Sequence, residues 1–262
     1  MTNQPSKFPT DAEVVIVGVG GIVGSMLAYW LAELGQKNII GLEKSTIIPS
    51  DIASTAHASD FVYNTTHDKL GCWATNFSRN FYEENGFFLK KGGLEICRKD
   101  DDARWEELKR KVESGKAFGT NIRLISAAEA KEKFPLLDEE SIRGAMWDPD
   151  AGLVTPRSQD VVNFAVETAK ETGALKTYTD TPAIGFEIEN GRIVGVKTDK
   201  GIIRTKKVVI ASGIWGPLMG DMASVPVPLM PVEHPLLFFG PLPEIQGTEE
   251  LLVYPLLRDQ GN

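Results

Sequence analysis

A short apolar strand, a cluster of glycines and a second apolar segment constrain this chain more than any other feature of its sequence. Val14 to Val17 are β-branched and predict a buried strand, and the apolar residues that run from the glycine cluster to Gly35 predict a helix. A second strand is expected at 38–43, with Glu43 at its carboxyl end. This order is typical of a dinucleotide-binding βαβ unit.

The glycine cluster is expected to hold a pyrophosphate. Glycine permits a tight turn and close approach of the ligand to main-chain N–H groups, and the following helix N-terminus favours an anion. Glu43 stands where a carboxylate accepts hydrogen bonds from a ribose 2′-hydroxyl and disfavours the 2′-phosphate of NADP. The spacing is one residue longer than G-x-G-x-x-G, which predicts a bulged turn. Its glycines are Gly18, Gly20, Gly21 and Gly24.

Composition narrows the class of protein. A chain of 262 residues suits one large or two small domains, and 42% hydrophobic with 24% charged residues is ordinary for a soluble protein. The net charge of −8 argues against nucleic acid or an anionic membrane as partner. The two cysteines, Cys72 and Cys97, lack C-x-x-C spacing, which suggests a reducing compartment. With no signal peptide and no apolar stretch of about 20 residues, a cytoplasmic location is expected.

Periodicity and turn residues predict the remaining elements. Helices are expected at 70–85, 100–112, 161–172 and after a capping box formed by Ser126 and Glu129. A strand–turn–strand is expected at 87–98, with its turn at 91–93 and its second strand at 94–97. Further strands are expected at 176–178, 183–189, 192–198, 201–205, 207–213, 225–234, 236–239 and 251–256. Asn190-Gly191 predicts a hairpin, and the strand at 207–213 is expected to return to the first sheet with Gly213 near the cofactor.

Metal and hydrolytic chemistry have little support in the sequence. The three histidines form no H-x-x-x-H or Cys/His cluster. The segment that starts at Asp148 fails as a calcium loop, because its sixth position is Leu153 and its twelfth is Gln159. No G-x-S-x-G nucleophile elbow is present.

Several motifs occur in a characteristic order along the chain. They are the opening unit, Ser54-Thr-Ala-His57, Gly92-Gly-Leu-Glu95, Phe134-Pro-Leu-Leu137, Trp147-Asp-Pro-Asp-Ala-Gly-Leu153, the meander at 183–205, Val208-Val-Ile-Ala-Ser-Gly-Ile-Trp215 and Pro228-Leu-Met-Pro-Val-Glu-His234. Together they resemble the D-amino-acid-oxidase-like FAD oxidoreductases. Within these, the chain looks most like the branch of dimethylglycine oxidase, dimethylglycine dehydrogenase and sarcosine dehydrogenase.

The resemblance implies an α/β fold in which a Rossmann-like FAD-binding βαβ domain is joined to a mixed-sheet α+β substrate domain, truncated at the C-terminus. The FAD-binding domain is expected at 11–85 and 146–221. The substrate domain is expected at 86–145 and 222–262.

The resemblance also implies the cofactor contacts. In that branch the histidine of the Ser-Thr-x-His segment is bonded to the flavin 8α-methyl, so His57 becomes a candidate for covalent attachment, since an imidazole nitrogen is a nucleophile. Ala183 would act through its backbone beside the adenine. With the glycine turn and the strand ends, the candidate FAD-binding residues are Gly18, Gly20, Gly21, Ile22, Val23, Gly24, Glu43, Lys44, Ser54, Thr55, Ala56, His57, Phe61, Ala183 and Gly213.

His234 matches the active-site histidine of the family and would position the substrate and tune its amine, which must be neutral before hydride leaves the N-methyl carbon. The flavin performs the oxidation. The product would release formaldehyde or pass its carbon to tetrahydrofolate, which would need a C-terminal region that this sequence lacks.

The chain looks like an amino-terminal fragment, because it stops at Asn262, where the family's catalytic tyrosine should follow. Two alternatives stay open: another amine or amino-acid oxidase of the same fold, and a non-catalytic nucleotide-binding module. The sequence leaves open which N-methyl amine is preferred and whether oxygen or an electron-transfer flavoprotein accepts the electrons.

Overall fold

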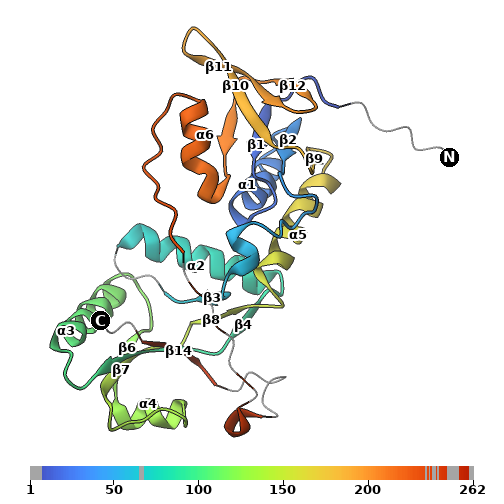
Figure 1. Cartoon of the computed structure of the whole chain (residues 1–262). Helices are drawn as coiled ribbons and strands as arrows, with labels where there is room; N and C mark the ends of the chain where they lie inside the picture. Colours follow the sequence, from blue (N-terminus) through green and yellow to red (C-terminus); the bar gives the residue numbers. More distant parts are fainter. Residues whose placement is uncertain are drawn as a thin grey trace. The chain divides into compact units, whose positions relative to one another are not determined.

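The computed structural model describes residues 8–64, 68–233, 235, 237, 240, 242–246 and 254–259. The chain forms two compact units, each built from two stretches of sequence (Figure 1). The first unit comprises Met1–Ala58 and Arg157–Leu236, and the second comprises Ser59–Pro156 and Leu237–Asn262.

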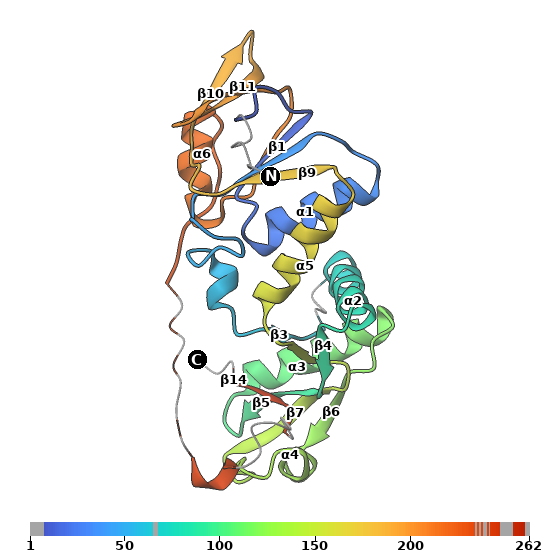
Figure 2. The ribbon, with the colours of Figure 1, turned by 90° about the vertical axis from the view of Figure 1, so that its right-hand side faces the viewer.

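The first unit is built on a parallel sheet whose strand order is β13-β1-β2-β9. Its strands are β1 (Val14–Val17), β2 (Ile39–Leu42), β9 (Leu175–Tyr178) and β13 (Val208–Ile210). Helices α1 (Ile22–Glu33) and α5 (Ser158–Glu171) lie side by side (Figure 2) and pack on one face through residues such as Ala28 and Val162. Every residue of β1 and β2 is buried. The predicted βαβ unit is therefore confirmed.

The other face of this sheet is covered by an antiparallel meander and a short helix. The meander is β10 (Ala183–Glu189), β11 (Arg192–Thr198) and β12 (Gly201–Arg204), and the helix is α6 (Gly216–Met222). Phe186 and Met219 pack against Val15 and Val17 of β1. Asn190 and Gly191 both have positive φ, 50° and 73°, as a type I′ turn requires, so the predicted hairpin is confirmed.

The second unit contains a mixed sheet and a smaller antiparallel sheet. The mixed sheet has the order β14-β5-β7-β6, in which only β14 and β5 run parallel. The strands of the two sheets are β5 (Gly93–Arg98), β6 (Arg123–Ser126), β7 (Ile142–Asp148) and β14 (Leu256–Asp259), then β3 (Phe61–Val62), β4 (Phe88–Lys90) and β8 (Gly152–Val154).

Three helices complete the second unit: α2 (Lys69–Glu84), α3 (Asp102–Ala117) and α4 (Ala127–Lys133). Side chains alternate along β5, so Leu94 and Ile96 pack in the cluster with Ala130 of α4, whereas Cys97 packs with Leu108 of α3. The predicted capping box at Ser126 and Glu129 is present at the start of α4. Among the described residues, no helix has the length and apolarity to cross a bilayer.

The boundaries of the compact units differ from those expected at 85/86 and 145/146. The chain changes unit at 58/59 and 156/157 instead. The reason is strand pairing: β8 pairs with β3 and β4, and β7 pairs with β5, which assigns 59–85 and 146–156 to the second unit. Assignment of the two units to FAD and to substrate stays a prediction.

The carboxyl-terminal strands are also placed differently. Residues 225–233 form no strand, because the prolines at 226, 228 and 231 lack the N–H that a ladder needs. Of the strand expected at 251–256, residues 254 and 255 form no strand, and Leu256 is the first residue of β14. Residues 234, 236, 238, 239 and 251–253 lie outside the described residues.

Candidate functional site

A cavity of about 420 Å³ lies in the first unit at the carboxyl ends of its parallel strands. This is where open α/β sheets bind ligands. The cavity is lined by the turn after β1, the segments that follow β2 and β13, the start of β10, and α6. The lining residues are Val17, Gly18, Gly21, Ile22, Val23, Leu42, Glu43, Lys44, Ser50, Ile52, Ala53, Ser54, Thr55, Thr181, Pro182, Ala183, Ile184, Ala211, Ser212, Gly213, Ile214, Trp215, Leu218, Met219 and Met222.

The turn after β1 accommodates its additional residue by a bulge. The main-chain N–H groups of Gly18 and Val19 both donate to the carbonyl of Leu42, at 2.8 and 3.1 Å. Two successive donors on one acceptor are characteristic of a bulged strand. Gly18 has φ of +94°, which glycine adopts without strain, so the bulged turn expected from the long spacing is present.

Close packing excludes side chains from three of the glycines. A Cβ on Gly24 would lie 2.1 Å from the carbonyl oxygen of Gly18, and one on Gly18 would lie 2.6 Å from that of Ala211. A Cβ on Gly20 would lie 2.5 Å from Oε2 of Glu43. These glycines bring helix α1, the turn and the end of β13 together, and the compactness of the turn fits close approach of a pyrophosphate.

Gly21 and the start of α1 form the part of the turn that faces the cavity. Gly21 is the N-cap residue of α1 and has no side-chain cap. The hydroxyl of Thr55 accepts a hydrogen bond from the N–H of Ile22 at 3.0 Å. The helix N-terminus, which favours negative charge, thus borders the cavity beside a hydroxyl that can donate to a ligand. These features fit the diphosphate of a dinucleotide.

Glu43 holds the turn and the following loop in place. Its side chain is buried, with Oε2 accepting from Gly20 N at 2.9 Å and Oε1 accepting from Ser45 N at 2.9 Å and Ser50 Oγ at 3.1 Å. The N–H of Ser50 in turn donates to the carbonyl of Gly20 at 2.9 Å. The carboxylate therefore joins β2, the glycine turn and the loop, a role that sequence spacing did not indicate. Its contact with a ribose stays a prediction.

Most predicted cofactor residues meet at the cavity. Ten of them line it: Gly18, Gly21, Ile22, Val23, Glu43, Lys44, Ser54, Thr55, Ala183 and Gly213. Gly20 and Gly24 do not line the cavity and make the packing contacts described above.

The other predicted site residues do not line the cavity. Ala56 and His57 belong to the 3₁₀ turn η1 (Ser54–His57) but are not among the lining residues. His57 is exposed, and its Nε2 lies 3.2 Å from the carbonyl oxygen of Asp51. Phe61 belongs to the second unit. His234 lies outside the described residues.

Sequence reasoning missed the apolar wall of the cavity. Ile52, Ile184, Ile214 and Leu218 are each at least 40% exposed and line it, and exposed apolar side chains that gather in a hollow mark a binding site. Trp215, in the 3₁₀ turn η2 (Gly213–Trp215), lines it as well. The sequence could have indicated Trp215 by one property alone: it closely follows the strand expected at 207–213, which was expected to join the first sheet.

The hydroxyl of Ser212, between β13 and η2, is buried and has no hydrogen-bond partner among the described residues. Ser212 also lines the cavity. Buried polar groups are nearly always satisfied, so an orphaned hydroxyl at this position fits a site that takes a polar ligand.

Two groups with a raised pKa lie close to each other in the second unit. Burial raises the pKa of the Asp148 carboxyl, although Asn64 donates to it twice, at 2.7 and 2.8 Å. Burial also raises the pKa of the Tyr63 hydroxyl well above its usual value. Among the described residues, no group of three or more His, Cys, Asp or Glu side chains is arranged to hold a metal ion.

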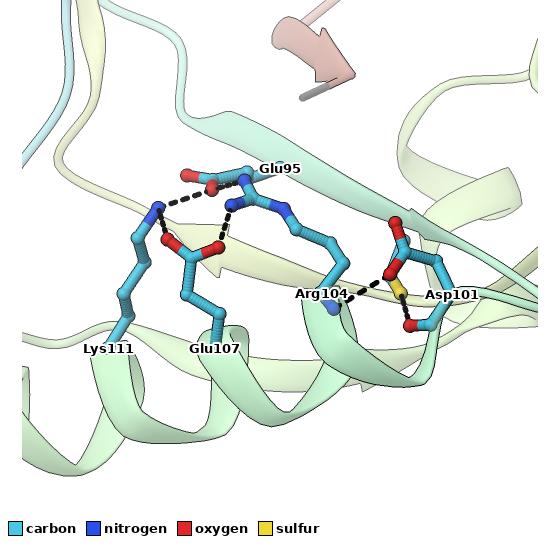
Figure 3. Close-up of polar contacts among 6 residues, drawn as sticks. Glu95, Asp101, Arg104, Glu107 and Lys111 are labelled. Atoms are coloured by element: carbon cyan, nitrogen blue, oxygen red, sulfur yellow. Dashed lines mark hydrogen bonds and ion pairs between the residues drawn. The ribbon is translucent and has the colours of Figure 1, made fainter. Parts of the chain in front are cut away.

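A network of buried charges joins α3 to β5 (Figure 3). Glu95 on β5 accepts from Arg104 and from Lys111, whose Nζ lies 2.7 Å away. Glu107 accepts from Arg104 at 2.6 Å and lies 3.4 Å from Lys111. Glu95, Arg104 and Lys111 are all buried. The two carboxylates and two cations balance in charge, and we interpret this network as a structural element.

The family model described as FAD dependent oxidoreductase matches residues 13–261. The chain belongs to this family. Human mitochondrial sarcosine dehydrogenase is 29% identical over 88% of this chain and 26% of its own length. Rat mitochondrial dimethylglycine dehydrogenase is 28% identical over 98% of this chain and 29% of its own length. The chain thus spans less than a third of these relatives.

Solved structures agree with the fold. L-proline dehydrogenase from P. horikoshii is similar with a TM-score of 0.75 and 34% identity, over 83% of this chain and 57% of that one. The family and the α/β fold class expected from the sequence are therefore confirmed.

Proposed function

We propose that this chain is the FAD-binding part of an oxidoreductase that oxidises an N-methylated glycine of the dimethylglycine or sarcosine type. The observation that carries the proposal is the cavity at the carboxyl ends of the parallel strands, which contains the glycine turn of an FAD-dependent oxidoreductase. The similarity to sarcosine and dimethylglycine dehydrogenases supports the substrate class.

Different residues of the cavity would bind different parts of FAD. The backbone at Gly18 and Gly21 and the start of α1 would bind the diphosphate, and the Thr55 hydroxyl would donate to it. Ala183 would bind the adenine through its backbone. Bound FAD supplies the two-electron oxidation of the amine. His234 would hold the substrate with its amine neutral, and the oxidised amine would yield formaldehyde or transfer its carbon to tetrahydrofolate.

A second candidate function is oxidation of a secondary amino acid such as proline. It is favoured by the 34% identity to an L-proline dehydrogenase, which covers 83% of this chain. Both candidates place FAD in the same cavity and differ in the substrate alone.

The first prediction concerns flavin binding and substrate. The purified chain, supplied with FAD, should show flavin absorption bands that persist through gel filtration. Anaerobic addition of sarcosine or dimethylglycine should bleach these bands and release formaldehyde. Bleaching by L-proline without bleaching by the N-methyl amines would favour the second candidate. A colourless protein that binds NAD instead would contradict both.

The second prediction concerns covalent attachment through His57. A fluorescent flavin band should survive SDS denaturation of the wild-type protein and disappear in His57→Ala. His67→Ala serves as the histidine control and should keep the band. FAD that binds wild-type protein but is released completely by SDS would show that His57 forms no covalent bond.

A further inference from the structure

A lysine outside the cavity is bonded to the segment that leads into the cavity wall. Lys200 lies in the turn between β11 and β12. Its ammonium donates to three oxygens of consecutive residues, which are the carbonyls of Thr179 and Asp180 and the hydroxyl of Thr181. The distances from Nζ to Thr179 O and to Thr181 Oγ1 are 3.2 and 2.9 Å. An ammonium has three N–H donors, which match these three oxygens in number.

The turn that carries Lys200 is itself held in place. Thr198 ends β11 and Gly201 begins β12, and the two residues are paired in the ladder. The hydroxyl of Thr198, a buried residue, donates to the carbonyl of Gly201 at 2.8 Å and accepts from the N–H of Lys200 at 3.1 Å. The backbone of Lys200 is therefore fixed to the meander, and its side chain reaches from there to the segment after β9.

The segment 179–181 joins β9 to β10 and is bonded on two sides. Asp180 has φ of +47°, a left-handed conformation that is uncommon for residues other than glycine. The N–H groups of residues 180 and 181 donate to the carbonyls of Ser45 and Glu43, at 2.8 and 2.9 Å. The oxygens of the segment accept from the Lys200 ammonium, and hydrogen bonds from a charged donor are stronger than neutral ones. The chain after β2 thus holds the N–H groups of the segment, and Lys200 holds its oxygens.

The conformation of this segment decides where the cavity wall lies. Thr181, Pro182 and Ala183 line the cavity, whereas Lys200 does not. Thr181 is fully buried and is both a partner of Lys200 and a lining residue. A change in the contacts of Lys200 would therefore reach the cavity through one residue.

We propose that Lys200 is a positioning residue for ligand binding in the cavity. Its ammonium keeps the segment before β10 in the conformation that forms the wall at Pro182 and Ala183, so the cavity has this wall before a ligand binds. Without the ammonium, only a fraction of the molecules has the binding-competent wall, and the affinity falls by that fraction. This inference rests on the proposed function, in that the ligand is FAD.

The experiment measures FAD affinity by calorimetry, and amide hydrogen exchange at 178–184 without ligand, in the full 262-residue chain. Lys200→Met removes the charge and keeps the length of the side chain. It should weaken FAD by roughly 10- to 100-fold, the range for loss of hydrogen bonds from a charged group. It should also speed exchange of the amides of Asp180 and Thr181. Lys206→Met, which alters an exposed lysine outside the cavity lining, is the matched control and should behave like wild type.

A second variant tests whether the ammonium itself is responsible. Lys200 is exposed, so in Lys200→Ala a small cation from the solvent can reach the three oxygens. Methylammonium, which has three N–H donors, should restore most of the FAD affinity. Tetramethylammonium at the same concentration has no N–H donor and should restore none.

The outcomes separate this inference from the proposed function. If wild-type protein binds FAD and Lys200→Met binds it equally well, the positioning role is overturned while the proposed function stands. Faster exchange with unchanged FAD affinity would show a structural role alone and would also overturn it. Equal rescue by the two ammonium ions would overturn the role of the N–H donors. If wild-type protein binds no FAD, the proposed function fails and the positioning role with it.

Discussion

Replacement of Glu95 by alanine is expected to lower the free energy of unfolding by about 3–5 kcal/mol, the usual cost of removing one partner from a buried ion network. The reason is that Arg104 and Lys111 are buried and both donate to Glu95. Without Glu95 the remaining charges are two cations and one carboxylate, Glu107. Urea denaturation followed by circular dichroism measures the change.

Two further variants make this prediction specific. Glu113→Ala removes a surface partner of Lys116 and should change stability by less than about 1 kcal/mol. The triple variant Glu95→Leu, Arg104→Met and Lys111→Met removes the buried charges together and should recover most of the loss. A Glu95→Ala protein as stable as Glu113→Ala would show that the network contributes nothing.

Local patterns sufficed for much of the fold. The β-branched run, the glycines and the apolar segment up to Gly35 predicted β1, the turn and α1, because each element is specified by residues close together in sequence. The Asn190-Gly191 hairpin and the Ser126 capping box were confirmed for the same reason. The hairpin depends on positive φ at two adjacent residues, and the capping box depends on two reciprocal hydrogen bonds between residues three positions apart.

The unit boundaries and the cavity wall depend on contacts between residues far apart in the sequence, which local patterns do not predict. The boundary near Ala58 depends on β3 pairing with β8, roughly ninety residues later, and no local pattern specifies that partner. The cavity wall depends on α6 and the meander packing on the same sheet face, which brings Ile184 and Leu218 to the turn. The spacing of the sequence predicts that Glu43 contacts a ribose. It could not show that the Glu43 carboxylate accepts hydrogen bonds from Gly20 and Ser50.

Among the described glycines of the first unit, Gly24 is the one at which an added Cβ would meet the nearest atom. A Cβ there would lie 2.1 Å from the carbonyl oxygen of Gly18 and 2.9 Å from the Cα of Val19. Both atoms belong to the backbone of the turn, so no side-chain rotation can relieve the clash. Gly24→Ala must therefore push α1 away from β1 and from the glycine turn.

We expect Gly24→Ala to destabilise the chain by about 1–3 kcal/mol. It should also abolish FAD binding, because the start of α1 and Gly18 would no longer both face the position proposed for the FAD diphosphate. Thermal unfolding and FAD titration measure the two effects. Gly216→Ala is the matched helical control: its Cβ would lie 3.8 Å from Val227, an ordinary contact, and it should keep both stability and FAD binding. If Gly24→Ala binds FAD like this control, close packing of α1 on the turn is not what forms the site.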